Sequence, residues 1–340
     1  MCGIAGIFRH TGVSQADVEQ VKQMNALQKH RGPDDEGLFA DSRVVLGHRR
    51  LAIIDLSRDG KQPFASDDGR YQLVFNGELY NYIEIRKELI RHGWTFRTKT
   101  DTEVLLKAYQ HYGQDCLHRF NGMFAFVIYD AQQQSLFLAR DRVGIKPLYY
   151  TILDSNLYFA SEIKALCNIS RLNKSINYQT LFDYLVFNRT DIYDETFFNK
   201  IRRIPKGCHA VFDQEGLQIK QWWNPENYIN DQGVTDTEKI IRNIEKIFIS
   251  AVQLRMRSDV PVGSCLSGGL DSSIMIGALY EHCNIEQNYP TFTASFPGHP
   301  IDEIKYIDSL NRNYAFKSIR TFPDAGKAYN SLKKFLYAND

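Results

Sequence analysis

The hydrophobic residues change their spacing near residue 224, and this change limits the chain to an architecture of at least two parts. Before residue 224, short runs rich in aromatic or β-branched residues predict strands, among them 124–129, 136–139 and 157–160. A few segments with helical spacing lie between them, so we expect layered sheets covered by helices. After residue 224, strand-like and helix-like segments alternate, which is typical of a parallel sheet with helical crossovers.

The boundary between the two patterns is a polar stretch that contains Pro225, Asn230, Asp231 and Gly233. We therefore predict an N-terminal domain over 2–221, a linker over 222–236 and a second domain over 237–340. A chain of 340 residues is long enough for two domains of ordinary size.

Several element boundaries follow from capping residues and periodicity. Ser14 precedes a predicted helix through Leu27, and Thr100 with Glu103 is a candidate capping box. Thr235 with Glu238 is another. In the second part we expect a helix over 240–252, a strand over 260–266, a helix over 272–282, a strand over 291–296 and a helix over 302–312.

Composition excludes several classes of protein. The chain has 41 basic and 40 acidic side chains, so its net charge of +1 provides no overall attraction to nucleic acid or to an anionic membrane. The longest apolar runs are far shorter than the ~20 residues that span a bilayer. The six cysteines are scattered, without a C-x-x-C motif, which fits a reducing compartment. We expect a cytoplasmic protein without nucleic-acid or membrane partners.

Cys2 follows the initiator methionine directly, and this position has chemical consequences. If Met1 is removed, one residue carries a thiol with a reference pKa of about 8.5 and an α-amine with one near 7.7–8.0. The amine can accept the thiol proton, so Cys2 supplies both nucleophile and base. Taken alone, however, a cysteine at this position is more often incidental.

Five downstream segments favour a functional role for Cys2 over an incidental one. They are HRGPD (30–34), HRRL (48–51), NGELYN (76–81), TDTE (100–103) and RDRVGIKPLY (140–149). Each has an ordinary explanation; Asn76-Gly77, for example, is a common hairpin turn. Together and in this order, they closely resemble the class II glutamine amidotransferase domain. That domain is an N-terminal-nucleophile (Ntn) hydrolase with an αββα sandwich, and the resemblance covers roughly the first 200 residues.

The resemblance implies a role for each motif residue. Cys2 attacks the glutamine side-chain amide, and the Asn76 side chain with the Gly77 backbone N–H forms the oxyanion hole. Arg50 binds the α-carboxylate of glutamine, Asp101 pairs with its α-ammonium, and Glu78 lines the pocket. Two further residues, His30 and His48, are better explained as structural than as bases, because the α-amine is available.

The second part contains SGGLDSS at 267–273, between a predicted strand and a predicted helix. Taken alone, this is a strand-to-helix turn with Ser272 or Ser273 as the helix cap. The full motif resembles the PP-loop of ATP pyrophosphatases, in a Rossmann-like parallel-sheet domain. The resemblance implies ATP binding by the motif and by the ends of two strands. The implied ATP-binding residues are Leu266, Ser267, Gly268, Gly269, Asp271, Ser272, Ser273 and Ala294, with Asp271 also placing Mg²⁺.

The two domains in this order resemble the glutamine-hydrolysing asparagine synthetase family over essentially the whole chain. The resemblance implies an ATP-dependent ligase that adenylates aspartate and amidates it with ammonia from glutamine, and it implies a homodimer. Family members continue well past the position of Asp340, so we expect glutamine hydrolysis more firmly than asparagine formation. Two alternatives stay open: a relative that amidates a sugar acid for a surface polysaccharide, and a non-catalytic regulatory homologue.

Overall fold

A computed structural model of the chain describes residues 1–190, 193–229, 236–285 and 287–340. Contacts between residues divide it into two units, Met1–Ile229 with Asp340, and Asn230–Asn339. Asn230, Asp231 and Gly233 of the predicted linker, and Thr235 of the predicted capping box, lie outside the described residues.

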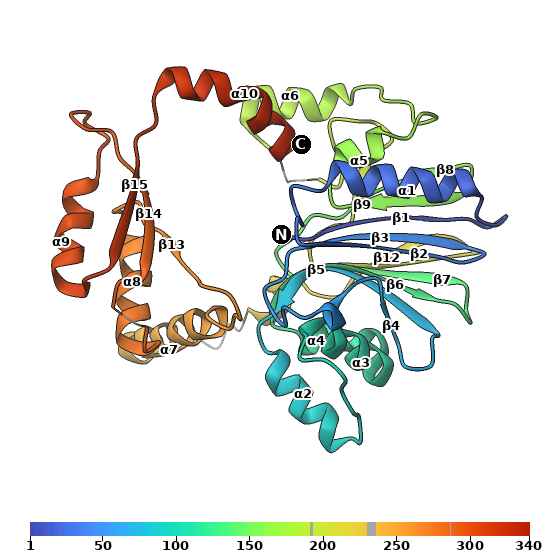
Figure 1. The fold of residues 1–340 in the computed structure, drawn as a ribbon, viewed down its shortest axis with the longest axis horizontal. Coiled ribbons are helices and arrows are strands. Elements are labelled where there is room, and N and C mark those ends of the chain that lie inside the picture. Colours follow the sequence, from blue (N-terminus) through green and yellow to red (C-terminus); the bar gives the residue numbers. More distant parts are fainter. Residues whose placement is uncertain (191–192, 230–235, 286) are drawn as a thin grey trace. The chain divides into compact units, whose positions relative to one another are not determined.

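The first unit contains two antiparallel sheets (Figure 1). The spatial order of one sheet is β10 (Arg202–Arg203), β8 (Tyr149–Leu153), β9 (Asn156–Ala160), β1 (Gly3–Phe8), β3 (Val44–Arg50) and β2 (Asp35–Ala40). The spatial order of the other is β12 (Gly216–Gln221), β11 (Cys208–Asp213), β7 (Ser135–Arg140), β6 (Gly122–Asp130), β5 (Tyr71–Leu79) and β4 (Phe64–Ala65).

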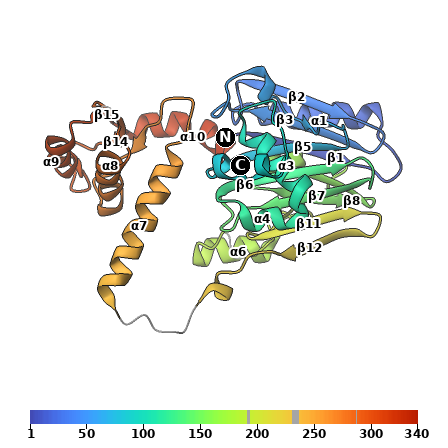
Figure 2. The ribbon, with the colours of Figure 1, turned by 90° about the horizontal axis from the view of Figure 1, so that it is seen from below.

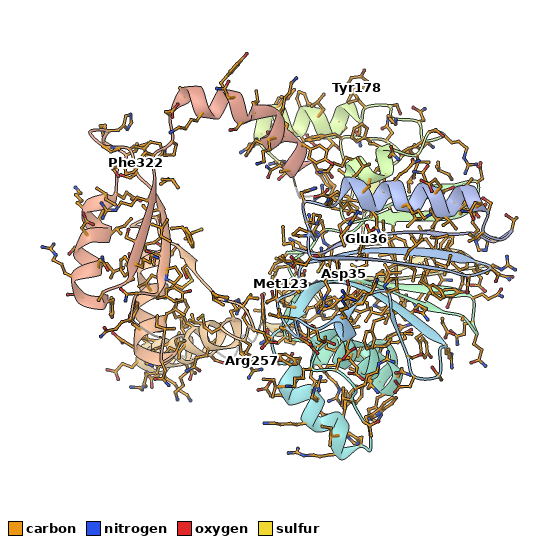
Figure 3. All side chains as sticks on the ribbon, viewed as in Figure 1. Asp35, Glu36, Met123, Tyr178, Arg257 and Phe322 are labelled. Carbon is orange, nitrogen blue, oxygen red and sulfur yellow. The ribbon has the colours of Figure 1, made fainter. Side chains whose placement is uncertain are left out.

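Helices cover the outer faces of both sheets (Figures 1 and 2). Helices α1 (Gln15–Leu27) and α5 (Ile163–Cys167) share a core with the first sheet, and α2 (Tyr82–Arg91), α3 (Asp101–Tyr112) and α4 (Cys116–Arg119) share one with the second. A third core fills the space between the sheets. The predicted αββα sandwich is therefore confirmed. The unit also contains α6 (Tyr178–Phe187), whose apolar side chains include Tyr178, exposed and pointing outward in Figure 3.

The three cores explain why strand alternation looked ragged in the sequence. On β5, Leu73 and Phe75 pack against the helices, whereas Val74 packs against the other sheet. Because both faces of such a strand are buried, apolar residues occupy successive positions instead of every second one. The Asn76-Gly77 pair lies inside β5, so the alternative of a hairpin turn at this pair is wrong.

The second unit has a parallel sheet in the order β13 (Ser264–Cys265), β14 (Pro290–Ala294) and β15 (Lys317–Thr321). The remaining elements are α7 (Thr237–Arg255), α8 (Leu270–His282), α9 (Ile304–Tyr314) and α10 (Ala325–Asn339). Helices α8 and α9 join successive strands, which confirms the predicted crossovers. The strand predicted over 260–266 is only two residues long, because Pro261 has no N–H to donate and Ser258 turns the backbone at Val260.

The helix caps differ in detail from the predictions. The Ser14 hydroxyl accepts the Asp17 N–H at 3.3 Å, as predicted for the start of α1. Thr100 caps α3, but the Glu103 carboxylate bonds to the backbone N–H groups of Arg97 and Thr98, so the reciprocal half of the capping box is missing. Asp236 caps α7, and Gly269, not Ser272 or Ser273, is the N-cap residue of α8.

Candidate active site

Cys2 lies directly before β1, a central strand whose six residues are all buried. Its Sγ accepts the backbone N–H of Leu51 at 3.4 Å and lies 3.7 Å from the Leu51 carbonyl oxygen. Burial raises the pKa of the Cys2 thiol, and this rise is opposed by the backbone contact with Leu51 and by the positive charges of the chain terminus and Lys146. A thiol in these surroundings needs a base to become a nucleophile.

The backbone of Cys2 is held by a buried ion pair that we did not predict. The Arg31 guanidinium donates to the Cys2 carbonyl oxygen at 2.9 Å and to the Glu162 carboxylate at 3.1 Å. Met1, in contrast, is 56% exposed. Burial lowers the pKa of the Met1 amine, and the charges of Lys146 and Arg31 lower it further, whereas the charges of Cys2 and Glu78 oppose this shift. Arg31 belongs to the quoted HRGPD motif, but the sequence provides no signal for its partner 131 residues away.

Arg50 ends β3 with its guanidinium turned into the loop that follows. It donates to the carbonyl oxygen of Ser57 at 2.7 Å and to that of Asp55. Gly60 leaves room for this arrangement, because a Cβ at Gly60 would lie 2.2 Å from Arg50 Nη2. The two carbonyl groups orient the guanidinium without neutralising its charge.

Asn76 and Gly77 lie next to each other near the end of β5. The Asn76 side chain is fully buried, and neither atom of its amide has a hydrogen-bond partner among the described residues. Such a group is costly in a folded protein unless it serves a ligand. Gly77 packs so tightly that a Cβ would lie 2.3 Å from the carbonyl oxygen of Met123, a residue labelled in Figure 3.

Two carboxylates lie near the end of the same strand: Glu78 is inside β5, and Asp101 contacts its last residue. The Asp101 side chain, at the start of α3, accepts the Leu79 N–H at 3.0 Å. Burial raises the pKa of Asp101 to about 7, and the charge of Glu78 adds to the rise. Burial also raises the pKa of Glu78, an effect that the positive charge of Lys146 opposes.

A cavity brings these groups together. Its lining includes one thiol, one guanidinium, two carboxylates and a strip of backbone; the lining residues are Cys2, Arg50, Leu51, Ile53, Ile54, Gln62, Phe75, Gly77, Glu78, Thr100, Asp101 and Thr102. Asn76 is the one predicted site residue of this unit that does not line the cavity; it lies between two residues that do. Gln62 was not predicted; it bonds to the Phe75 N–H at 2.7 Å and to Thr102 at 3.3 Å.

The two histidines that were weighed as possible bases, His30 and His48, have partners elsewhere. His48 is fully buried, and its Nε2 donates to the Phe75 carbonyl oxygen at 3.0 Å, which joins β3 to β5 across the sandwich. Burial lowers the pKa of His48 to about 4. The His30 ring contacts the Glu162 carboxylate at 2.9 Å. Neither residue lines the cavity that contains Cys2.

The glycine-rich loop of the second unit connects β13 to α8. Gly268 has a φ of +90°, and a Cβ there would lie 2.9 Å from the Cβ of Glu303, so only glycine fits without strain. The Ser272 and Ser273 hydroxyls both donate to the Gly269 carbonyl oxygen, at 3.1 and 2.8 Å. Gly269 has no side chain to cap α8, and among the described residues no side chain replaces it, so the first N–H groups of this helix can bind an anion as a ligand.

A cavity of about 610 Å³ lies beside this loop. It is lined by Cys265, Leu266, Ser267, Ser272, Phe292, Thr293, Ala294, Phe296, Ile301, Glu303 and Thr321. Leu266 and Ala294, which the PP-loop resemblance implied as ATP-binding residues, line this same cavity. Gly268, Gly269, Asp271 and Ser273 are in the loop or the first turn of α8 but do not line the cavity.

The described residues contain neither a metal-binding cluster nor a helix that could span a membrane. No three His, Cys, Asp or Glu side chains of the described residues gather where they could hold a metal ion. None of the described helices combines the length and the apolar character that crossing a membrane requires.

Comparisons with known proteins agree with the two units. Residues 1–223 match the family model of the glutamine amidotransferase domain, and residues 243–340 match that of asparagine synthase. Glutamine-hydrolysing asparagine synthetase 1 of Bacillus subtilis is 36% identical over 342 residues, which cover 100% of this chain and 53% of that protein. Asparagine synthetase 3 of the same organism is 35% identical, over 87% of this chain and 48% of that protein. The chain thus spans about half the length of these curated relatives.

Among solved structures, a glutamine phosphoribosylpyrophosphate amidotransferase from B. subtilis, complexed with ADP and GMP, is similar to this chain. The TM-score is 0.50 at 16% identity, and the match covers 94% of this chain and 81% of that one. At this identity the likeness concerns the fold alone. The family matches confirm the resemblance that the motifs predicted.

Proposed function

The chain belongs to the glutamine amidotransferase family, and from this premise we propose that its first unit hydrolyses glutamine to glutamate and ammonia. One observation carries the proposal: Cys2, Arg50 and Asp101 line the same cavity. Glutamine offers one reactive group and two charged groups of opposite sign, and this cavity offers a matching partner for each.

Recognition of glutamine follows from the charges. Arg50 binds the α-carboxylate, because a planar guanidinium suits two carboxylate oxygens and its backbone contacts hold it in place. Asp101 accepts the α-ammonium, with Glu78 beside it. This leaves the side-chain amide of glutamine directed toward the thiol.

Once Met1 has been removed, Cys2 supplies the nucleophile, its sulfur, and the base, its α-amine. Both act in the formation of the thioester and in its hydrolysis. The neutral α-amine takes the thiol proton as the sulfur bonds to the amide carbon. Collapse of the tetrahedral intermediate breaks the C–N bond, and the ammonium returns its proton to the departing nitrogen, which leaves as ammonia. Water then attacks the γ-glutamyl thioester and passes a proton to the amine. The C–S bond breaks, the sulfur regains its proton, and glutamate leaves.

The oxyanion of each tetrahedral intermediate needs donors that are already in place. The Asn76 amide supplies one, since its buried side chain has no competing partner among the described residues. The Gly77 N–H supplies the other from the same strand. Preorganised donors of this kind cost no reorganisation during the reaction.

Glutamate release tests the proposal directly. Purified protein whose intact mass shows loss of Met1 is incubated with glutamine, and glutamate and ammonia are measured. We expect equal amounts of the two products without ATP or aspartate. Absence of glutamate from correctly processed protein would contradict the proposal.

The pKa of Asp101 predicts how glutamine binding depends on pH. With a pKa of about 7 in the free site, Asp101 is mostly neutral at pH 6 and mostly ionised at pH 8, whereas the glutamine ammonium is charged at both. KM for glutamine should therefore be about tenfold higher at pH 6 than at pH 8. Steady-state kinetics at several pH values measure this. Asp101→Asn should have a high KM that does not change over the range, and a wild-type slope in this variant would refute the assignment.

For the second unit we propose ATP binding and use of the ammonia in an ATP-dependent amidation, with aspartate as the acceptor. The open N–H groups of α8, the Ser272 hydroxyl and the glycine backbone of the loop suit a polyphosphate. Mg²⁺, with Asp271 as its ligand, would neutralise phosphate charge there. An acceptor panel of aspartate and sugar acids, with ATP and glutamine, distinguishes asparagine formation from amidation of another carboxylate.

Gly268→Ala tests the phosphate-binding loop. The new methyl group must displace Glu303 and occupy a left-handed conformation, so we expect ATP affinity to fall by roughly tenfold or more. Titration calorimetry measures the effect. Gly298→Ala is the matched control, because Gly298 also has a positive φ of +79° but has nothing within 4 Å of an added Cβ. Equal losses in both variants would show that backbone strain, not the loop, is responsible.

A further inference from the structure

Gln62 is a buried residue of the Cys2 cavity to which the proposed reaction assigns no task. It is 4% exposed and lines the cavity, and both ends of its side-chain amide have partners. Its Oε1 accepts the Phe75 N–H at 2.7 Å, and its Nε2 donates to the Thr102 hydroxyl at 3.3 Å. One side chain therefore connects β5, which carries the candidate oxyanion hole, to the start of α3, which carries Asp101.

Gln62 occupies the place where strand β4 would otherwise continue along the edge of β5. The paired part of β4 begins at Phe64, and its register, continued two residues toward the N-terminus, brings Gln62 opposite Phe75. Strand pairing does not reach that point, because Pro63 has no N–H and the backbone of Gln62 turns toward β2, where a Cβ on Gly37 would lie 1.8 Å from the Gln62 carbonyl oxygen. The side chain of Gln62 takes the place of a strand backbone and accepts the Phe75 N–H.

Three N–H groups near the end of β5 point to this same edge. Alternate residues of a strand direct their backbone groups to the same side, so the N–H groups of Phe75, Gly77 and Leu79 share one direction. The pairing with β6 agrees at Gly77: its partner Phe124 has both its N–H and its carbonyl group bonded to Asp141, and so faces away from β5. The Gly77 N–H therefore points away from β6, to the same edge as the Phe75 N–H.

Side chains hold the outer two of these three N–H groups. Gln62 accepts the N–H of Phe75, and Asp101 accepts the N–H of Leu79 at 3.0 Å. The group between them belongs to Gly77, which lines the cavity. The strand is thus fixed two residues before and two residues after the N–H that the oxyanion needs.

We propose that Gln62 is a positioning residue for glutamine hydrolysis: its side-chain amide substitutes for a strand at the edge of β5 and holds the Gly77 N–H where the oxyanion forms. The inference rests on the proposed function of the first unit. Through Thr102, the same amide also ties this part of β5 to the start of α3, where Asp101 binds the α-ammonium. A preorganised donor is effective only when its position is fixed before the charge develops, so loss of this contact should lower kcat more than it changes KM.

The kinetics of Gln62→Met, in protein that has lost Met1, test the proposal. Methionine is similar in length, but its thioether is only a weak acceptor, so the Phe75 N–H loses its partner. We expect kcat for glutamate release to fall by about tenfold or more, with KM within about threefold of wild type. The fold should survive, because β6 still pairs along β5 and His48 still donates to the Phe75 carbonyl oxygen.

The aldehyde analogue of glutamine gives a second readout that does not depend on turnover. The Cys2 sulfur bonds to its carbonyl carbon, the C=O π bond breaks, and the thiol proton passes to the oxygen, which then lies in the oxyanion hole. Affinity for this aldehyde should fall in Gln62→Met by the same factor as kcat, whereas affinity for glutamate should stay within about threefold of wild type. Thr102→Val keeps the Phe75 contact of Gln62 but removes the partner of its Nε2, so it should show a smaller loss in kcat and in aldehyde affinity.

Ser66→Ala is the matched control, because the buried Ser66 hydroxyl also accepts a backbone N–H of β5, that of Tyr71 at 2.9 Å, at the opposite end of the strand. We expect a lower Tm with unchanged kcat and aldehyde affinity. An unchanged kcat in Gln62→Met, or a loss equal to that in Ser66→Ala, would overturn the role of Gln62 and leave the glutaminase proposal standing. Should Gln62→Met fail to fold, an unchanged kcat in Thr102→Val would overturn it. A wild type that releases no glutamate would defeat the glutaminase proposal itself.

Discussion

Replacing Cys2 with alanine is expected to abolish glutamine hydrolysis, with kcat reduced by more than about 10³-fold. Cys2 supplies the one thiol among the described residues that line the cavity, and alanine keeps the α-amine and a small residue before β1. The fold should survive, because the Arg31 contact involves the carbonyl group of residue 2 and not its side chain. Glutamate release by the variant measures the loss of activity, and its Tm shows whether the fold is retained.

Cys167→Ala serves as the control for this variant. Cys167 is a free, half-buried thiol in the same unit and is absent from the lining of the Cys2 cavity. It should retain wild-type kcat. A diazoketone analogue of glutamine should add one equivalent of mass to the wild type and to Cys167→Ala, but none to Cys2→Ala. Residual turnover within tenfold of wild type in Cys2→Ala would mean that another group is the nucleophile.

The Asn76→Ala variant should lose about 10²–10³-fold in kcat with little change in KM, because the donor acts on charge that develops after binding. Its stability should change little. Alanine removes a buried amide whose polar atoms have no partner among the described residues, so no hydrogen bond is lost. An activity defect without a stability defect is therefore expected.

Asn156→Ala should show the opposite behaviour. Asn156 is also buried, but its side chain accepts the His10 N–H at 3.1 Å and donates to the Asp154 carbonyl oxygen at 2.7 Å. Its loss should lower Tm and leave kcat per folded molecule unchanged. If Asn76→Ala keeps full kcat, the Asn76 side chain does not stabilise the oxyanion.

Much of the fold could be predicted because its local signals are strong. Ser14 predicted the start of α1, and the apolar run near Phe124 predicted β6, since both depend on neighbouring residues. Helix α6 was not predicted: seven of its ten residues are apolar or aromatic, and so dense an apolar run does not distinguish a helix from a strand. Similarly, β13 was predicted too long because a run of apolar residues does not reveal where strand pairing stops.

The candidate site also contains residues that could be predicted from the sequence and residues that could not. Cys2, Arg50 and Asp101 could be named because they belong to motifs with defined spacing. Gln62 belongs to no motif, and Arg31 and Lys146 lie within motifs that do not indicate what each side chain faces. The role of Arg31 depends on a partner that is far away in the sequence, Glu162.

The amino-acid sequence alone determined which reactive and binding groups this chain contains. They are a thiol whose residue becomes N-terminal on loss of Met1, an asparagine-glycine pair, and a glycine-serine loop before a helix. Tertiary structure decided which of these groups share a cavity, and what charge each carries there. The reason is physical: a pKa and an unpaired amide depend on burial and on neighbours within a few ångströms, and β1, β3, β5 and α3 meet only when the sheets pack.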